Sequence, residues 1–211
     1  MKSRVTVDSE GTVTGNTFDK YGSTHPVVRR LMAGFHRDLD ACYAMAAPTS
    51  ILDIGCGEGV LTHEWAGRLP SGGRIVGTDL DDPLLHAQWE QRRASNLEYR
   101  VMKGEQLEFA DNEFDTATAI EVLEHVSDPE MVLSEMSRCA ERWLLLSVPR
   151  EPLWRITNIA RGAYWSELGN TPGHLNHWSS RSFREMLSRY GEVVELRHPF
   201  PWVMAVVRLN G

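Results

Sequence analysis

The spacing of apolar residues changes along the chain. From His25 to Ala46, apolar side chains recur every three or four positions, which predicts an amphipathic helix. From residue 50 onward, short apolar runs alternate with helical patterns. The predicted strands are 50–55, 74–80, 97–102, 113–122 and 142–149, and the predicted helices between them are 59–69, 81–94 and 127–140. This alternation predicts an α/β fold with a doubly wound, mostly parallel sheet.

Two of these helices carry the same start signal. Asp82 and Asp128 each stand directly before a proline. An aspartate side chain can accept a hydrogen bond from the first helical turn, and proline fits the first helical position. We therefore expect both aspartates to be N-caps.

The last third departs from the alternation. A long connection rich in tryptophan, arginine and glycine occupies residues 150–178, and a serine-capped helix that ends at Gly191 follows it. Two strands, 193–199 and 202–210, then lie only a few residues apart. A parallel crossover needs a dozen residues or more, so these strands must form an antiparallel hairpin. The complete sheet is expected to have seven strands and to be Rossmann-like, with a helical insertion after the fifth strand.

A glycine-rich turn follows the first predicted strand of the sheet. The stretch "ILDIGCGEG", residues 51–59, places Gly55, Gly57 and Gly59 between a strand and a helix, which is typical of nucleotide-binding sites. The position of the third dinucleotide glycine holds Val60. Asp53 would repel a pyrophosphate and attract a ligand with a positive end, such as an amino-acid ammonium near a sulfonium.

A second acid stands at the end of the next strand. Asp79 lies 24 residues after Gly55. An acid at this position accepts hydrogen bonds from ribose hydroxyls. Because this role is common to NAD and S-adenosylmethionine, Asp79 indicates an adenosine ligand without choosing between the two.

Three motifs in order resemble one enzyme family. "ILDIGCGEG", "VGTDLD" and "GEQLEFADNEFDTATAIEVLEHV" resemble the class I S-adenosylmethionine-dependent methyltransferases, within the group that includes ubiquinone and menaquinone methyltransferases. The resemblance covers about residues 20–150. It implies S-adenosyl-L-methionine as the cofactor and the fold expected above.

The resemblance also implies which residues contact the cofactor. Its methionyl end would be held by the first acid, the glycine loop and the end of the fourth strand, its ribose by the second acid, and its adenine by the residues beside that acid and after the third strand. Tyr21 would form an aromatic lid over the sulfonium, although a core-packing tyrosine is the alternative. The implied residues are Tyr21, Asp53, Gly55, Cys56, Gly57, Gly59, Asp79, Leu80, Gly104, Glu105, Ile120 and Glu121. Cys56 is interpreted as a small residue in a tight turn. Lys103 departs from the family pattern, because a lysine cannot accept a hydrogen bond from the adenine amino group.

Three histidines are candidates for the acceptor side. His125 follows the fourth strand, and His174 and His177 lie in the long connection. An imidazole titrates near neutral pH and can take the proton of a hydroxyl acceptor. A carbon or amine acceptor needs no strong base, and His125 would then only order its loop. No further ligands cluster beside His174 and His177 in the sequence, so we expect no metal site.

The chain is expected to form one domain, 1–211, in four parts. An N-terminal arm and helix that cover the cofactor occupy 1–46, and the cofactor-binding core occupies 47–149. An acceptor lid, 150–178, is too long for a mere connection, although a plain helix on the sheet edge is the alternative. Its apolar residues predict a fairly apolar acceptor and a peripheral contact with lipid. The C-terminal helix and hairpin occupy 179–211.

Composition limits the setting. A net charge of −7 argues against nucleic acid as the partner. Three cysteines without paired spacing indicate a reducing cytoplasm. The sequence contains no run of about 18 apolar residues, so we expect no membrane-spanning helix. The N-terminus has no apolar core typical of a signal peptide. The expected assembly is a monomer or a homodimer.

The resulting hypothesis is an enzyme of small-molecule metabolism. We expect a methyltransferase that methylates an oxygen of a small, fairly apolar acceptor. Three alternatives stay open: a C- or N-methyltransferase of a small metabolite, a non-catalytic module that binds S-adenosylmethionine, and an enzyme acting on RNA or protein. The acidic charge argues against the last, as does "IEVLEH", which stands where such enzymes carry an Asn/Asp-Pro-Pro-aromatic motif.

Overall fold

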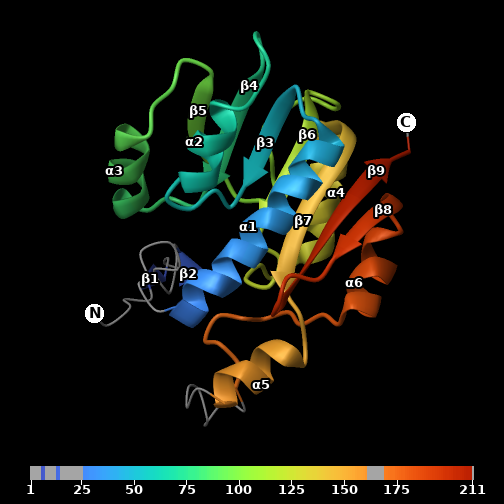
Figure 1. Ribbon diagram of the computed structural model, residues 1–211. Coiled ribbons are helices and arrows are strands. Elements are labelled where there is room, and N and C mark those ends of the chain that lie inside the picture. The colour runs from blue at the N-terminus through green and yellow to red at the C-terminus, as the bar shows by residue number, and fades with distance from the viewer. Residues whose placement is uncertain (1–5, 8–12, 15–25, 161–168, 211) are drawn as a thin grey trace.

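The computed structural model describes residues 6–7, 13–14, 26–160 and 169–210. A seven-stranded sheet lies at the centre, and helices cover both of its faces (Figure 1). The expected fold class, a Rossmann-like and mostly parallel α/β sheet, is confirmed. Two short strands, β1 (Thr6–Val7) and β2 (Val13–Thr14), pair antiparallel before the first helix.

The order of strands in the sheet is β5-β4-β3-β6-β7-β9-β8. Neighbours from β5 to β7 pair in parallel, whereas β9 pairs antiparallel with both β7 and β8. The predicted C-terminal hairpin is therefore confirmed. The strands are β3 (Ser50–Ile54), β4 (Arg74–Asp79), β5 (Leu97–Val101), β6 (Phe114–Ile120), β7 (Ala140–Pro149), β8 (Gly191–Arg197) and β9 (Trp202–Leu209).

One face of the sheet is covered by α1 (Pro26–Ala46) and α2 (Val60–Ala66). The apolar positions of α1 meet β7 and β9, where Phe35 lies edge-on against Trp202 with 4.9 Å between ring centroids. Trp65 of α2 joins the same buried cluster. The helix ends at Ala66, three residues before the sequence pattern predicts, with Gly67 at its C-cap.

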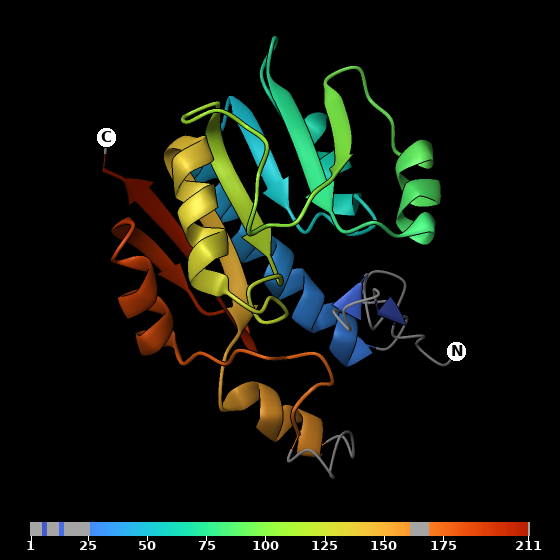
Figure 2. The same cartoon turned by 180° about the vertical axis from the view of Figure 1, so that it is seen from behind.

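The opposite face is covered by α4 (Pro129–Cys139) and α6 (Ser180–Leu187), as the reverse view shows (Figure 2). Their buried residues pack on the inner side of β6, β7 and β9 in one continuous cluster. Ser179 caps α6, as expected. The helix ends at Leu187 rather than near Gly191, because Gly191 already pairs with Leu209 as the first residue of β8.

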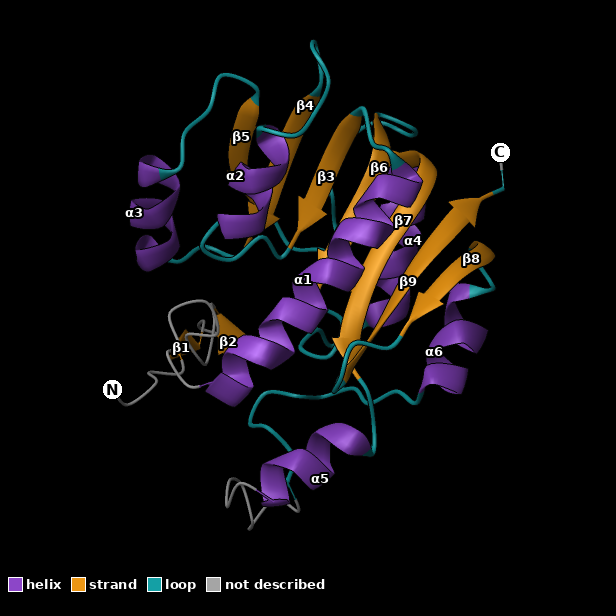
Figure 3. Cartoon of the chain, viewed as in Figure 1, coloured by secondary structure: helices purple, strands orange, loops and turns teal. Residues whose placement is uncertain are grey.

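Helices α3 (Pro83–Gln91) and α5 (Leu153–Ala160) lie outside these two layers (Figure 3). Asp82 accepts a hydrogen bond from the Leu84 amide at 2.8 Å, and Asp128 accepts one from the Met131 amide at 3.0 Å. Both predicted N-caps are therefore confirmed. The helix α5 follows β7 near the carboxyl ends of the parallel strands, where ligands bind in open α/β sheets.

Within residues 26–160 and 169–210, no helix combines the length and the apolar character that a bilayer-spanning segment needs.

Candidate active site

The glycine loop joins β3 to α2 at the carboxyl edge of the sheet. Gly55, Gly57 and Gly59 all take positive φ angles, of 66°, 53° and 75°. A Cβ atom at Gly57 would have no heavy atom within 4 Å, whereas one at Gly59 would lie 2.4 Å from the hydroxyl oxygen of Tyr99. Gly57 therefore faces open space, and Gly59 is closed in by packing.

Two aromatic residues hold the backbone carbonyls of the glycine loop. The indole Nε1 of Trp89 donates to the Gly57 carbonyl at 2.8 Å, and the Tyr99 hydroxyl donates to the Gly59 carbonyl at 3.3 Å. The two rings stack with centroids 5.1 Å apart and planes only 2° from parallel. Sequence reasoning missed both residues, because nothing local distinguishes an aromatic that supports a loop from one that fills the core.

Asp53 lies beneath the loop rather than on its surface. Its side chain is 4% exposed, and its two oxygens accept hydrogen bonds from Thr62 at 2.7 Å and Thr118 at 2.6 Å. Burial raises the pKa of the Asp53 carboxyl from 3.8 to about 6. The structure thus shows Asp53 tying β3 to α2 and β6, and its contact with the methionyl end of a cofactor stays a prediction.

The two threonines that hold Asp53 were missed by sequence reasoning. Thr118 is the register partner of Asp53 on β6, and Thr62 lies in the first turns of α2. The available signal was the pattern "FDTATAI", in which hydroxyl residues interrupt an otherwise apolar buried strand. A buried hydroxyl requires a hydrogen-bond partner, so such a pattern indicates a polar group on a neighbouring strand.

Asp79 connects the glycine loop to the end of β4. One carboxylate oxygen accepts from the Gly57 amide at 2.6 Å, and the other accepts from the Leu80 amide at 2.8 Å. Burial raises the pKa of Asp79, and these two amide donors oppose that effect. Each oxygen keeps a second lone pair, so the carboxylate can still accept ribose hydroxyls. Leu80, half-buried, lies directly beside it.

The segment predicted to line adenine passes next to Asp79. The Met102 amide donates to the Asp79 backbone carbonyl at 2.9 Å, so residues 102–105 leave β5 beside this acid. Gly104 and Glu105 are both half-buried there. A Cβ at Gly104 would lie 3.1 Å from the Ile54 side chain, so Gly104 packs against the end of β3.

Ile120 ends β6, two residues earlier than the sequence pattern predicts. The strand stops because Glu121 takes a left-handed conformation with φ of 62°. One Glu121 carboxylate oxygen accepts from the Ser147 hydroxyl at 3.0 Å, and the other accepts from Trp202 Nε1 at 2.5 Å. The Glu121 side chain is therefore held by β7 and β9, which sequence reasoning did not foresee.

His125 and His174 come together, 49 positions apart in the sequence. Their rings meet edge to face, with centroids 4.9 Å apart. His125 Nδ1 lies 2.9 Å from the Gly173 carbonyl oxygen. Since a carbonyl only accepts, Nδ1 carries the proton of the neutral ring, and Nε2 keeps its lone pair. His125 Nε2 lies 4.0 Å from a carboxylate oxygen of the buried Glu124.

These three side chains could also ligate a metal. One ligand atom from each of Glu124, His125 and His174 lies within 4.8 Å of the other two. Two imidazole nitrogens and a carboxylate oxygen suit a transition-metal cation. Sequence analysis considered a metal only at His174 and His177, so this grouping is a finding of the structure. It gives His125 a second interpretation besides that of a base.

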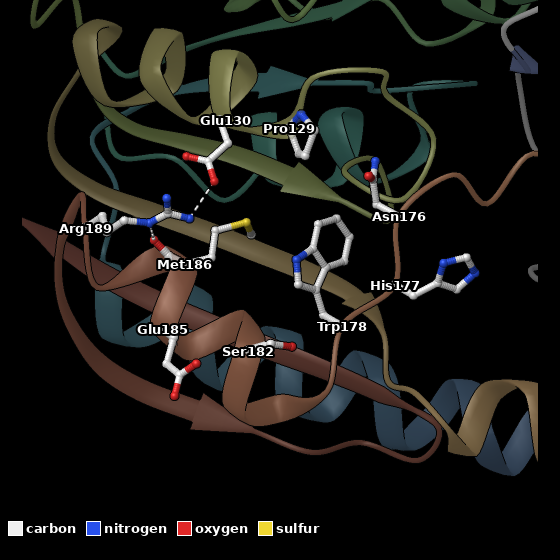
Figure 4. A pocket seen from close by; sticks show the side chains of 9 residues that line it. All are labelled: Pro129, Glu130, Asn176, His177, Trp178, Ser182, Glu185, Met186 and Arg189. Carbon is white, nitrogen blue, oxygen red and sulfur yellow. Dashed lines mark hydrogen bonds and ion pairs between the residues drawn. The ribbon is translucent and has the colours of Figure 1, made fainter.

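Of the three histidine candidates, His177 is not part of this group. His177 is exposed, with Nε2 2.7 Å from the Asn170 amide oxygen, and it lines a groove of about 510 Å³ beside Trp178 and α6 (Figure 4). Tyr21 lies outside the described residues. Cys56 is packed in the loop, where burial raises the pKa of its thiol well above the ordinary value, as expected for a structural residue.

Comparison with known proteins bears on this geometry. The family model described as "Methyltransferase domain" matches residues 52–142. A ubiquinone biosynthesis O-methyltransferase of Pseudomonas fluorescens is 31% identical over 151 residues, which cover 63% of this chain and 63% of the relative. One of Methylococcus capsulatus is 33% identical over 146 residues, covering 61% and 60%. The chain thus spans less than two thirds of the length of these relatives.

Solved structures share the fold. Magnesium protoporphyrin IX methyltransferase of Synechocystis PCC 6803, solved with bound SAH, superposes with a TM-score of 0.64 at 18% identity, covering 90% of each chain. A SAM-dependent methyltransferase of Aquifex aeolicus gives a TM-score of 0.67 at 16% identity, covering 88% of this chain and 94% of the other. These likenesses show the fold, and the sequence matches confirm the resemblance that the three motifs indicate.

Alanine at the two glycine positions is expected to have separable effects. Gly57→Ala should lower the free energy of unfolding by about 1–2 kcal/mol, because a residue with a Cβ is strained in the left-handed conformation. It should also weaken binding of an adenosine ligand, because the added methyl group enters the open space at the loop. Gly59→Ala should cost more, because its methyl also displaces the Tyr99–Trp89 pair. Urea denaturation ranks the two variants. Equal stability losses would contradict the distinction between the two positions.

Asp53→Asn is expected to change how stability depends on pH. The folded carboxyl has a pKa of about 6 against 3.8 for the free group, so the folded state holds the proton more tightly. The contribution of Asp53 is therefore present at low pH and lost as pH rises through 6. Between pH 4.5 and 7.5, the free energy of unfolding of the wild type should fall by about 2 kcal/mol relative to the variant. A difference that stays constant with pH, matching that of exposed Asp81→Asn, would refute this.

Proposed function

We propose that this chain, whose residues 52–142 form a methyltransferase domain, is an S-adenosylmethionine-dependent methyltransferase that acts on a small acceptor. The observation that carries the proposal is the hydrogen bond between the Gly57 amide and the Asp79 carboxylate. It places an adenosine-binding acid beside the open face of a glycine loop, at the edge where α/β sheets bind ligands.

The charge around the loop supports this cofactor over a dinucleotide. Asp53 lies beneath the loop, Asp79 lies beside it, and exposed Asp81 follows two residues later. Three carboxyl groups would repel the phosphates of NAD. The sulfonium and ammonium of S-adenosylmethionine carry positive charge, which the same carboxylates attract.

In this proposal each part of the site has one task. S-adenosylmethionine supplies an electrophilic methyl group to a nucleophile aligned with the departing sulfur. Asp79 accepts the ribose hydroxyls while holding Gly57, and Leu80 and Gly104 border the adenine. The loop amides and the end of β6 at Ile120 face the methionyl part. Bringing the acceptor atom to within about 3–3.5 Å of the methyl would be the main source of rate.

We further propose an oxygen acceptor on an apolar molecule. His125 supports this, because donation from Nδ1 to the Gly173 carbonyl makes Nε2 the basic nitrogen of the neutral ring, and a basic imidazole nitrogen can take the proton of a hydroxyl. Apolarity is supported by Trp154, which packs between His174 and Trp202 near the same loop. The similar ubiquinone biosynthesis enzymes are named as O-methyltransferases, which agrees with this choice.

A nitrogen acceptor is the second candidate. The fold also superposes on 1,6-didemethyltoxoflavin-N1-methyltransferase of Burkholderia thailandensis, with a TM-score of 0.63 at 17% identity, covering 85% of this chain and 79% of the other. An amine acceptor would need no strong base, and His125 would then serve to order its loop or to ligate a cation with Glu124 and His174.

The setting of the enzyme is part of the proposal. All three cysteines are free, which supports a reducing cytoplasmic location. Ile156 of α5 and Leu175 are more than half exposed, which supports contact of the 150–178 region with an apolar surface such as lipid. A monomer or homodimer without a nucleic-acid partner agrees with the acidic net charge.

Asp79→Ala is expected to weaken S-adenosylmethionine binding at least tenfold. The substitution removes the ribose acceptor and releases the Gly57 amide, and a hydrogen bond to a charged group contributes about 1.5–3 kcal/mol. Isothermal titration calorimetry measures the affinity. Asp81→Asn is the matched control: it removes only the long-range attraction of an exposed neighbouring carboxylate and should lose no more than about twofold in affinity. Unchanged affinity in Asp79→Ala would contradict the ribose assignment, and tight NAD binding by the wild type would end the proposal.

His125→Gln is expected to separate the two interpretations of His125. With methylhydroquinone as a hydroxyl acceptor, loss of a general base should lower the rate of methyl transfer by about 10²-fold or more while S-adenosylmethionine affinity stays constant. Formation of S-adenosylhomocysteine is the readout. Wild-type activity that disappears with EDTA and returns with a divalent cation would instead identify His125 as a metal ligand.

A further inference from the structure

Helix α5 is tied to the segment that carries His174 by a buried polar cluster. Trp154 Nε1 donates to the Thr171 hydroxyl at 2.9 Å. Asn158, only 2% exposed, donates to the same hydroxyl at 3.1 Å and to the Gly169 carbonyl at 2.8 Å. We name Trp154, Asn158, Gly169 and Thr171 the α5 clip. Its three hydrogen bonds all connect α5 with residues 169–171.

The hydroxyl of Thr171 is the centre of this clip. It accepts from two donors that come from successive turns of α5, so it fixes both the position and the rotation of the helix relative to the segment. The indole N–H and the buried amide would otherwise have to find other acceptors in an apolar setting. Two of the three hydrogen bonds of the α5 clip therefore depend on the hydroxyl of Thr171.

The clip leads directly to His125. The turn after Thr171 is closed by the His174 amide, which donates to the Thr171 carbonyl at 3.0 Å. Within this turn, the Gly173 carbonyl receives Nδ1 of His125, and the His174 ring contacts the His125 ring. Trp154 lies against the other side of His174, with ring centroids 5.8 Å apart. The Gly173 carbonyl and the His174 ring, two of the groups that contact His125, thus lie in the segment that begins at Thr171.

We propose that Thr171 is a positioning residue, which acts through the α5 clip to place the Gly173 carbonyl and the His174 ring against the His125 ring, and so favours the ring form that is protonated on Nδ1. This role deepens the proposed methyltransferase function and rests on it for its catalytic consequence.

Thr171→Val tests this role, because valine has the shape of threonine without the hydroxyl. Nitrogen-15 NMR of the imidazole rings, in EDTA-treated buffer, should show the His125 ring moving from one dominant tautomer toward an average of two. The signals are assigned from their absence in His125→Gln. Methyl transfer to methylhydroquinone should lose about tenfold in kcat, while KM for S-adenosylmethionine stays within twofold.

Three further variants exclude a general structural effect. Thr171→Ser keeps the hydroxyl and should restore both the tautomer and kcat. Thr157→Val removes a hydroxyl of the same helix that donates only to the Leu153 and Trp154 carbonyls, and it should behave as wild type. Trp154→Phe keeps a ring but removes the N–H donor, and it should show a smaller change in the same direction even if Thr171→Val does not fold.

The two proposals fail differently. An unchanged His125 tautomer in Thr171→Val or Trp154→Phe, or an equal loss in Thr157→Val, overturns the positioning role. The tautomer measurement needs neither cofactor nor acceptor. Failure of the wild type to bind S-adenosylmethionine or to transfer methyl groups overturns the proposed function and leaves the tautomer test of the clip intact.

Discussion

The site depends on a single short hydrogen bond between two neighbouring strand ends. The Gly57 amide, at the tip of β3, meets the Asp79 carboxylate, at the tip of β4, at 2.6 Å. The bond is available only because Gly57 takes a left-handed conformation and because β3 and β4 are parallel neighbours in register. It fixes the loop before any ligand arrives, so binding does not have to order the loop and loses less conformational entropy.

This arrangement has a desolvation cost that the surrounding residues reduce. Asp53 and Asp79 are both removed from water, and burial raises the pKa of each. Threonine hydroxyls around Asp53 and backbone amides around Asp79 partly replace the lost hydration. The remaining unfavourable charge is a property that a cationic ligand can relieve and an anionic ligand would worsen. The same cost thus contributes to selectivity.

Local sequence signals predicted the strands, the helix caps and the acid at the end of β4. They did not predict side-chain contacts between segments that are far apart in the sequence. The strand before Gly55, the acid at Asp79 and the Asp-Pro caps each depend on a few adjacent residues, so the sequence alone predicts them. The bond from Trp202 to Glu121 joins residues 81 positions apart, and His125 meets Gly173 across 48 positions. Such pairs follow from strand order and side-chain direction, which a one-dimensional pattern does not contain. For the same reason His174, and not His177, joins His125.

The position of β9 has a consequence for how the protein is made. This strand follows β8 in the chain but lies between β7 and β8 in the sheet, and it supplies the tryptophan that holds Glu121 at the tip of β6. During synthesis, β3, β4 and β6 can associate well before residue 202 leaves the ribosome. Until then the edge of β7 that later pairs with β9 is unpaired, and Glu121 lacks its Trp202 donor. The nascent chain can therefore bring the glycine loop and Asp79 together early, and the end of β6 at Glu121 reaches its final form only when β9 is inserted.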